Sequence, residues 1–156
     1  VFPLDGQLDL DGLPRAEQAR RISLANEGLM SSCAATIANH TPFRGAAMDS
    51  GTAYEVGFMR ALGKPVFGYT NVTADYAERA RVVRAKGLTA GDFDAEGLEI
   101  EDFGLAENLM IAIAVSETGP EVVRHPSDVA NVRDDLEGFR QSAAAAAEYF
   151  KDNPAP

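Results

Sequence analysis

The chain has 156 residues, of which 46% are apolar and 24% are charged, and its formal net charge is −10 at pH 7. Both fractions are typical of globular proteins, so the composition predicts one domain over residues 1–156 and excludes wholesale disorder. The acidic balance argues against a nucleic-acid backbone or an anionic membrane surface as the main partner. It leaves open small nucleosides, which proteins recognise through local groups.

The sequence has one cysteine, Cys33, and no apolar run that approaches the roughly 20 residues of a membrane span. An internal disulfide is therefore impossible, which fits a protein of the reducing cytoplasm. Cys33 follows a helical pattern and precedes an apolar strand, so we expect it to be a buried structural thiol.

Short apolar runs alternate with amphipathic segments, a pattern typical of α/β folds with a parallel sheet. Residues 1–4 resemble the end of a strand, and because the chain opens there without Met, we expect the first strand of the sheet to be missing. Further strands are expected at 34–38, 65–70 and 121–125. Helices are expected at 14–32, 50–62, 75–86, 105–115 and 127–151, with an acidic surface loop at 89–102. The first helix carries an apolar stripe that includes Ile22, Leu24 and Met30.

The segment "MDSGTAYE" places two carboxylates, Asp49 and Glu55, around the start of a helix that follows a buried strand. In parallel α/β sheets, ligands bind at the carboxyl ends of the strands. Gly51 allows a ligand to approach the backbone, and Thr52 offers a hydroxyl. A carboxylate held ionised by the helix dipole can serve as a nucleophile toward a sugar C1, as a base or as a ligand contact. Spacing alone favours the alternative, an acid that only complements the dipole.

Neighbouring motifs change that balance. The stretches "NHTPFRG", "GKPVFGYTN" and "EDFGLAENLM", together with "DSGTAYE", closely resemble the nucleoside 2-deoxyribosyltransferase family. The resemblance covers most of the chain, from "VFPLD" through "NLMI". It implies a flavodoxin-like α/β fold and an enzyme that cleaves the N-glycosidic bond of 2′-deoxynucleosides and passes the deoxyribose to another nucleobase, as in nucleotide salvage.

The resemblance also implies roles for four residues. Glu55 matches the glutamate that attacks the anomeric carbon and forms a covalent deoxyribosyl ester, which an incoming base displaces with net retention. Asp49 matches an aspartate that contacts the base and is a candidate for moving its proton. Asn108 matches an asparagine that a neighbouring subunit offers to the sugar 5′-hydroxyl. Asn39 matches a position, often aspartate in the family, that helps to hold the base.

The loop "PFRG" and three other residues are less specific. Phe43 is as consistent with stacking on a base as with anchoring the loop. Arg44 could meet a phosphate, but we expect it to pair with a nearby acid. His40 and His125 lack metal-ligand partners at usable spacing and are expected to be ordinary loop residues, while Tyr54 is expected in the core.

The implied chemistry needs no metal and no organic cofactor, since carboxyl groups and substrates suffice for both half-reactions. We expect a homo-oligomer, a dimer or larger, in which a neighbouring subunit helps to close the pocket against water. The main alternative is a hydrolase of nucleoside or deoxynucleoside 5′-monophosphates, whose relatives tend to place a serine where this chain has Asn108. There are two further alternatives. One is a phosphoribohydrolase, but the motif of that group is preceded by a run of glycines, which "AAMDSGTAYE" lacks. The other is a non-catalytic nucleoside-binding module.

Overall fold

The computed structural model describes residues 8–83 and 97–154. Within these residues, three strands form one parallel sheet in the order β1-β2-β3. They are β1 (Thr36–Asn39), β2 (Val66–Thr70) and β3 (Val123–Arg124). The helices are α1 (Arg15–Ser32), α2 (Ser50–Ala61), α3 (Tyr76–Val83), α4 (Leu109–Ser116) and α5 (Glu137–Asp152). The expected strands and the α/β alternation are therefore confirmed at the positions that the structure describes.

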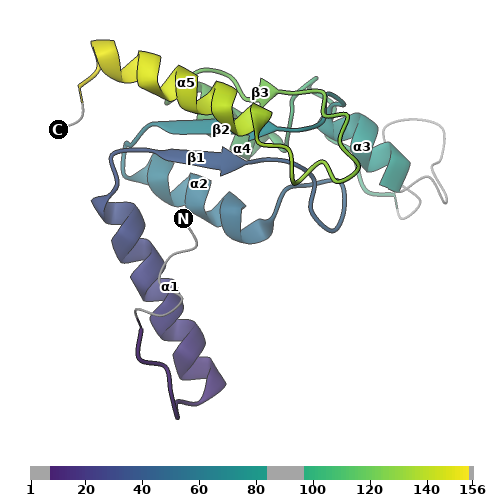
Figure 1. The fold of residues 1–156 in the computed structure, drawn as a ribbon. Coiled ribbons are helices and arrows are strands. Elements are labelled where there is room, and N and C mark those ends of the chain that lie inside the picture. Colours follow the sequence, from purple (N-terminus) through teal and green to yellow (C-terminus); the bar gives the residue numbers. More distant parts are fainter. Residues whose placement is uncertain (1–7, 84–96, 155–156) are drawn as a thin grey trace.

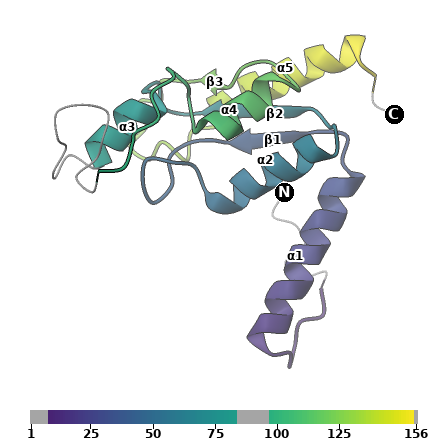
Figure 2. The same cartoon turned by 180° about the vertical axis from the view of Figure 1, so that it is seen from behind.

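The sheet is the middle layer of three (Figure 1). Its central strand, β2, is buried along its whole length, as expected of an apolar strand covered on both faces. Helices α2 and α4 cover one face (Figure 2), where Val56, Met59 and Val115 pack with Ala38 and Val66. This cluster is the main core of the described residues.

Helix α5 covers the opposite face of the sheet. Successive strand residues point to opposite faces, so Phe67 and Tyr69 face away from the α2 and α4 layer. The ring of Phe67 meets Tyr149 edge-on, with centroids 5.6 Å apart, and Tyr69 meets Phe139 edge-on at 6.0 Å. These aromatic pairs explain why α5, despite its alanine run, docks in one orientation.

Helix α1 has the predicted bounds but not a buried face. It projects from the layered body (Figure 1), and Ile22 and Leu24 are 37% and 51% exposed. Its carboxyl end is fixed, because Lys64 Nζ donates to the carbonyl oxygens of Ser31 and Cys33 at 2.5 and 2.7 Å. Cys33 itself is only partly buried, against the edge of the core.

Helix α4 begins at Leu109, four residues later than the sequence pattern predicts. Asn108 is the N-cap of α4, since Asn108 Oδ1 accepts a hydrogen bond from the Met110 amide at 3.0 Å. A capping amide competes well with a further helical turn at this position. The apolar pattern that begins at Leu105 therefore indicates a buried segment and not an earlier start of the helix.

Helix α5 begins at Glu137, so Ser127 does not cap it and the predicted start is wrong by ten residues. The intervening segment crosses the end of β2, where the Asn71 side-chain amide donates to the carbonyl oxygens of Val132 and Asp135 at 2.7 and 2.8 Å. These long-range bonds fix the segment as a turn-rich connection, which no local signal predicts.

Helix α3 starts where expected, and its predicted continuation to 86 lies outside the described residues, as do positions 1–4 and most of the acidic loop at 89–102. Over residues 8–83 and 97–154, no helix is both long and apolar enough to cross a membrane.

A buried ion pair joins α3, α4 and the loop that precedes α2. The Glu107 side chain is 0% exposed, and its Oε2 accepts hydrogen bonds from Arg79 Nη2 and the Met48 amide, both at 3.0 Å. The Asn108 amide donates to the other oxygen at 3.0 Å. Arg79 Nε donates in turn to the Ala46 carbonyl at 2.9 Å, so the loop is held on both sides of Ala47.

We predict that Glu107→Ala lowers the free energy of unfolding by about 3–5 kcal/mol, because it leaves the Arg79 guanidinium buried without its counter-charge. Urea denaturation would measure the change. Glu148→Ala, which removes a carboxylate of 70% exposed side chain, is the matched control and should change stability by less than about 0.5 kcal/mol. Equal effects of the two substitutions would contradict this assignment.

Candidate active site

Asp49 caps the amino end of α2. Its Oδ2 accepts hydrogen bonds from the amides of Gly51 and Thr52 at 2.9 and 3.2 Å. A Cβ at position 51 would lie 2.9 Å from the same oxygen, so a side chain there would require the Asp49 carboxylate to shift. The cap fixes the Asp49 carboxylate at the carboxyl edge of the sheet and leaves Oδ1 without a backbone donor.

Glu55 lies one and a half turns into α2, on the side that faces α1. It lines a groove of about 420 Å³ between the two helices, whose walls are mostly apolar and include Ala19, Ile22 and Met30. Gly51, next to the Asp49 cap, is part of the same lining. The groove therefore places the Glu55 carboxylate in a partly enclosed site at the helix that Asp49 begins.

Burial raises the pKa of Glu55, and the negative charge of Asp49 raises it further. The sequence suggested the reverse direction, since it placed Glu55 near the helix dipole. As the sixth residue of α2, Glu55 lies beyond the first turn, where the dipole acts most strongly. Two carboxylates therefore lie near the start of α2, one capping the helix and one partly buried.

Tyr54 forms part of the same groove rather than of the core. It is 55% exposed, and its hydroxyl donates to the Glu27 carboxylate of α1 at 2.5 Å. The expectation that Tyr54 lies in the core is therefore wrong, because Tyr54 lies on the side of α2 that faces α1. The hydrogen bond ties the two walls of the groove together.

Asn39 ends β1, at the same edge of the sheet as Asp49. Its Oδ1 accepts a hydrogen bond from the Thr41 amide at 2.9 Å, which shapes the turn into the following loop. The Asn39 side-chain NH₂ is thereby oriented and makes no hydrogen bond with another described residue. Thr52, by contrast, contributes its backbone amide to the Asp49 cap.

Asn108 has a polar partner within its own chain. Its Nδ2 donates to both oxygens of Glu101, at 3.0 and 2.8 Å, while its Oδ1 caps α4. The amide thus needs no second subunit to satisfy it. The Glu101 carboxylate also places a negative charge directly beside the Asn108 amide, a feature that the sequence did not indicate.

Phe43 lies under two guanidinium groups. Arg44 Cζ is 4.8 Å and Arg133 Cζ is 5.4 Å from the centre of its ring. Both are within the range of cation–π attraction. A base that stacked on this ring would have to displace one of them, so the contacts favour the reading of Phe43 as a loop anchor. Arg44 forms no ion pair with an acid of the described residues, contrary to expectation.

His40 is fully buried, not an ordinary loop residue. Its ring packs against Gly68, where a Cβ would lie 2.9 Å from Nε2, and neither ring nitrogen has a hydrogen-bond partner among the described residues. Burial, reinforced by the positive charge of Arg79, lowers the pKa of His40 to about 4. The buried hydroxyl of Thr70 also lacks a hydrogen-bond partner within the described part of the chain.

The structure brings together residues that the sequence could not connect. Glu107 and Arg79 hold the loop before Asp49, although they are far apart in the chain. The available signal was a charged residue inside the apolar stretch around "GLAENLMIAIA", since a charge at such a position usually has a buried partner. The identity of that partner depends on how α3 packs.

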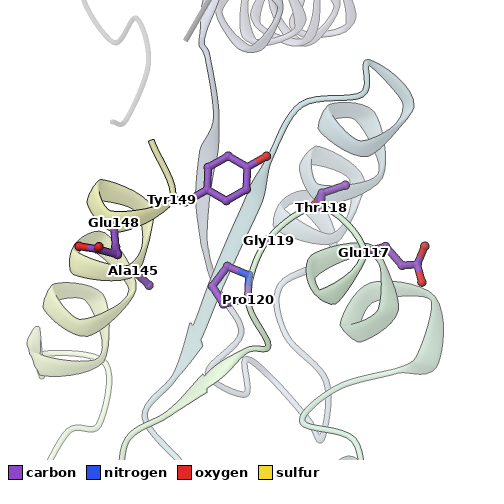
Figure 3. A pocket seen from close by; sticks show the side chains of 7 residues that line it. All are labelled: Glu117, Thr118, Gly119, Pro120, Ala145, Glu148 and Tyr149. Atoms are coloured by element: carbon purple, nitrogen blue, oxygen red, sulfur yellow. The ribbon is translucent and has the colours of Figure 1, made fainter. Parts of the chain in front are cut away.

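A larger cavity, of about 620 Å³, lies elsewhere (Figure 3). It is at the amino ends of the strands, between the end of α4 and α5, around Pro120 and Tyr149. The carboxylates of Glu117 and Glu148 point away from its centre in opposite directions. Ligands of parallel sheets bind at the carboxyl ends of strands, so the α1–α2 groove, and not this cavity, is the candidate active site.

A metal-binding cluster of His, Cys, Asp and Glu side chains is absent from the described part of the chain. His125 instead contacts the Asp135 carboxylate, with Nε2 and Oδ2 3.1 Å apart.

Comparison with known proteins places the chain in a family. The sequence model of the nucleoside 2-deoxyribosyltransferase family matches residues 1–110, which include Asp49, Glu55 and Asn108. The chain belongs to the nucleoside 2-deoxyribosyltransferase family.

Two relatives support this assignment. A 2-desoxiribosyltransferase from Leishmania mexicana shares the fold with a TM-score of 0.54 and 28% sequence identity, over 87% of this chain and 69% of that chain. An uncharacterized protein of Schizosaccharomyces pombe is 36% identical over 124 residues, which are 70% of this chain and 59% of the relative. The chain thus spans well under two thirds of the yeast protein. The predicted flavodoxin-like α/β class is confirmed.

We predict that the buried His40 makes the protein acid-sensitive. Its pKa is about 4 in the folded protein and about 6.5 when unfolded, so the unfolded chain binds more protons between these values. Stability should therefore fall as the pH is lowered from about 6.5 to 4, by up to about 3 kcal/mol from this residue alone.

Denaturant unfolding of the wild type and His40→Leu across this pH range would measure the effect. Leucine keeps the apolar contacts without a titrating group, so the difference in unfolding free energy should shift in favour of the variant as the pH falls. Parallel curves for the two proteins would contradict the prediction.

Proposed function

We propose that the protein transfers 2-deoxyribose between nucleobases, with Glu55 as the nucleophile and Asp49 as the proton-transfer group. The observation that carries the proposal is the Glu55 carboxylate in the α1–α2 groove, one and a half turns after the Asp49 cap, in a chain of this family. Its substrates would be a 2′-deoxynucleoside and a free nucleobase. The lone cysteine, which precludes an internal disulfide, fits a cytoplasmic role in nucleotide salvage.

In the first half-reaction, a Glu55 carboxylate oxygen attacks C1′ and the N-glycosidic bond breaks. The bonding electrons leave with the base, which takes a proton from the Asp49 carboxyl group. In the second, the carboxylate of Asp49 accepts the proton of the incoming base, whose nitrogen attacks C1′ and releases Glu55. Two displacements at one carbon give net retention.

The apolar groove walls suit this mechanism for two reasons. They exclude water, which would otherwise hydrolyse the ester before the second base arrives. They also weaken the solvation of the Glu55 carboxylate, which is consistent with the raised pKa of Glu55. A less solvated carboxylate is a stronger nucleophile, provided that the pH keeps it ionised.

Asn39 and Asn108 are proposed as substrate contacts, to the base and to the sugar 5′-hydroxyl. The Glu101 carboxylate bound to Asn108 favours a neutral hydroxyl at this position, because it would repel a 5′-phosphate. This contact supports nucleosides over nucleoside 5′-monophosphates as substrates. No cofactor enters the scheme.

We predict that Glu55→Gln lowers kcat for deoxyribosyl transfer from 2′-deoxyinosine to adenine by about 10³-fold or more, because the amide cannot form the ester. Asp49→Asn should lower kcat by about 10²–10⁴-fold through loss of proton transfer.

In the wild type, kcat should fall on the acid side at a higher pH than an ordinary carboxylate requires, since the pKa of Glu55 is raised.

Product analysis by chromatography would test this, with Glu117→Gln as a control that changes a carboxylate outside the lining of the groove. Deoxyadenosine formed only with intact Glu55 is the expected result. Free deoxyribose regardless of adenine would replace the transferase with a hydrolase. Cleavage of a 5′-monophosphate but not of 2′-deoxyinosine would favour the nucleotide hydrolase.

The proposed transferase is a homo-oligomer in which a second copy covers α4. Ala112, Ala114 and Val115 of this helix are buried in the core, whereas Met110 and Ile113 are 73% and 43% exposed. These exposed side chains follow directly after Asn108, so a copy that packs on them would border the proposed sugar contact.

We predict that Met110→Glu weakens this association by about tenfold or more, because it buries a charge in an apolar contact. Sedimentation velocity over a concentration series would measure the shift. Val82→Glu, at an apolar residue of α3 that is 76% exposed, is the control and should leave assembly unchanged. A fully active wild-type monomer would refute the shared assembly.

A further inference from the structure

A second hollow lies on the far side of the loop that leads to Asp49. Its volume is about 540 Å³, and it is lined by residues 43–47 and by part of α3. Phe43, Arg44, Tyr76 and Ala80 are among its lining residues, and none of the lining is shared with the Glu55 groove. A ligand in this hollow would therefore not occupy the candidate active site.

Arg44 is held at this hollow in an unusual backbone conformation. Its φ is 56°, in the left-handed region that side chains other than glycine seldom adopt. Its guanidinium lies over the Phe43 ring and forms no ion pair with a carboxylate of the described residues. Backbone strain of this kind persists where the surrounding structure enforces it, and it concentrates at functional sites.

A second guanidinium, that of Arg133, lies over the same ring. Arg133 Nη2 donates to the Pro42 carbonyl at 2.8 Å, and no acid among residues 8–83 and 97–154 pairs with it. Two like charges on one small ring repel each other in the absence of an anion. Their proximity is notable in a chain of net charge −10, where carboxylates to neutralise them are plentiful elsewhere.

The loop backbone adds further donors. The Phe43 amide closes the loop by donating to the Ala47 carbonyl at 2.9 Å. The amides of residues 44–46 donate to no acceptor within the described residues. A left-handed residue in a short loop turns successive amides toward one side, which is the arrangement of anion-binding nests. The φ of Arg44 supplies that residue here.

We propose that this hollow binds a phosphate group, free or carried by a nucleotide, through the Arg44 guanidinium and the amides of the 44–46 loop. Guanidinium groups match phosphate oxygens in a bidentate fork. Arg133, which lies over the Phe43 ring that lines the hollow, adds positive charge nearby. The site is independent of the deoxyribosyl chemistry and stands whether or not that proposed function holds.

Calorimetric titration of the Glu55→Ala protein tests the proposal without turnover. The probes are inorganic phosphate, adenosine 5′-monophosphate and adenosine. Phosphate and the monophosphate should bind, and Arg44→Gln should weaken both by about tenfold or more through loss of charge-assisted hydrogen bonds. Arg140→Gln, at an exposed arginine of α5, should leave both affinities unchanged.

Arg44→Gly guards against misfolding, because glycine accepts the left-handed conformation and removes the guanidinium. It should keep the wild-type melting temperature and lose phosphate affinity. Binding of phosphate that is unaffected by both Arg44 substitutions, or equal binding of adenosine and its monophosphate, would overturn the proposal. If the wild-type protein showed no transferase activity but phosphate binding still depended on Arg44, only the proposed function would be overturned.

Discussion

The buried pair of Glu107 and Arg79 organises the carboxyl edge of this sheet. A carboxylate removed from water is costly unless several donors replace its solvation, and Glu107 has three within 3.0 Å. Two of those donors are amides at helix starts: Met48 directly precedes the α2 cap Asp49, and Asn108 is itself the α4 cap. One carboxylate therefore fixes the starts of α2 and α4 relative to each other, while Arg79 anchors the loop between β1 and α2 to α3.

The groove that contains Glu55 depends on this framework in a different way. The Asp49 carboxylate is held in place because the first amides of α2 donate hydrogen bonds to it. The pKa of Glu55 is raised because the mostly apolar walls of the groove bury its carboxylate. Rigidity of one carboxylate and desolvation of the other are separate physical effects. Together they place two neighbouring acids in different environments, one capping α2 and one partly desolvated.

Arginines are distributed unevenly over the same edge. Arg79 and Arg124 pair with acids and with loop carbonyls, and so serve the fold. Arg44 and Arg133 instead share the Phe43 ring, without an acid from the described residues. The contrast matters because an arginine already neutralised by a carboxylate has little left to offer an anion, whereas these two keep their charge available.

The sequence by itself determined the α/β alternation, the bounds of α1 and α2, and the cluster of candidate residues around the start of α2, because these follow from local periodicity and capping. It failed at α4 and α5, whose starts depend on Asn108 and on contacts of Asn71 with a segment far along the chain. Only the tertiary structure decided that the stripe of α1 stays exposed, that His40 is buried, and that Glu107 meets Arg79. These outcomes depend on which surfaces meet, and burial and charge pairing are properties of packing rather than of sequence spacing.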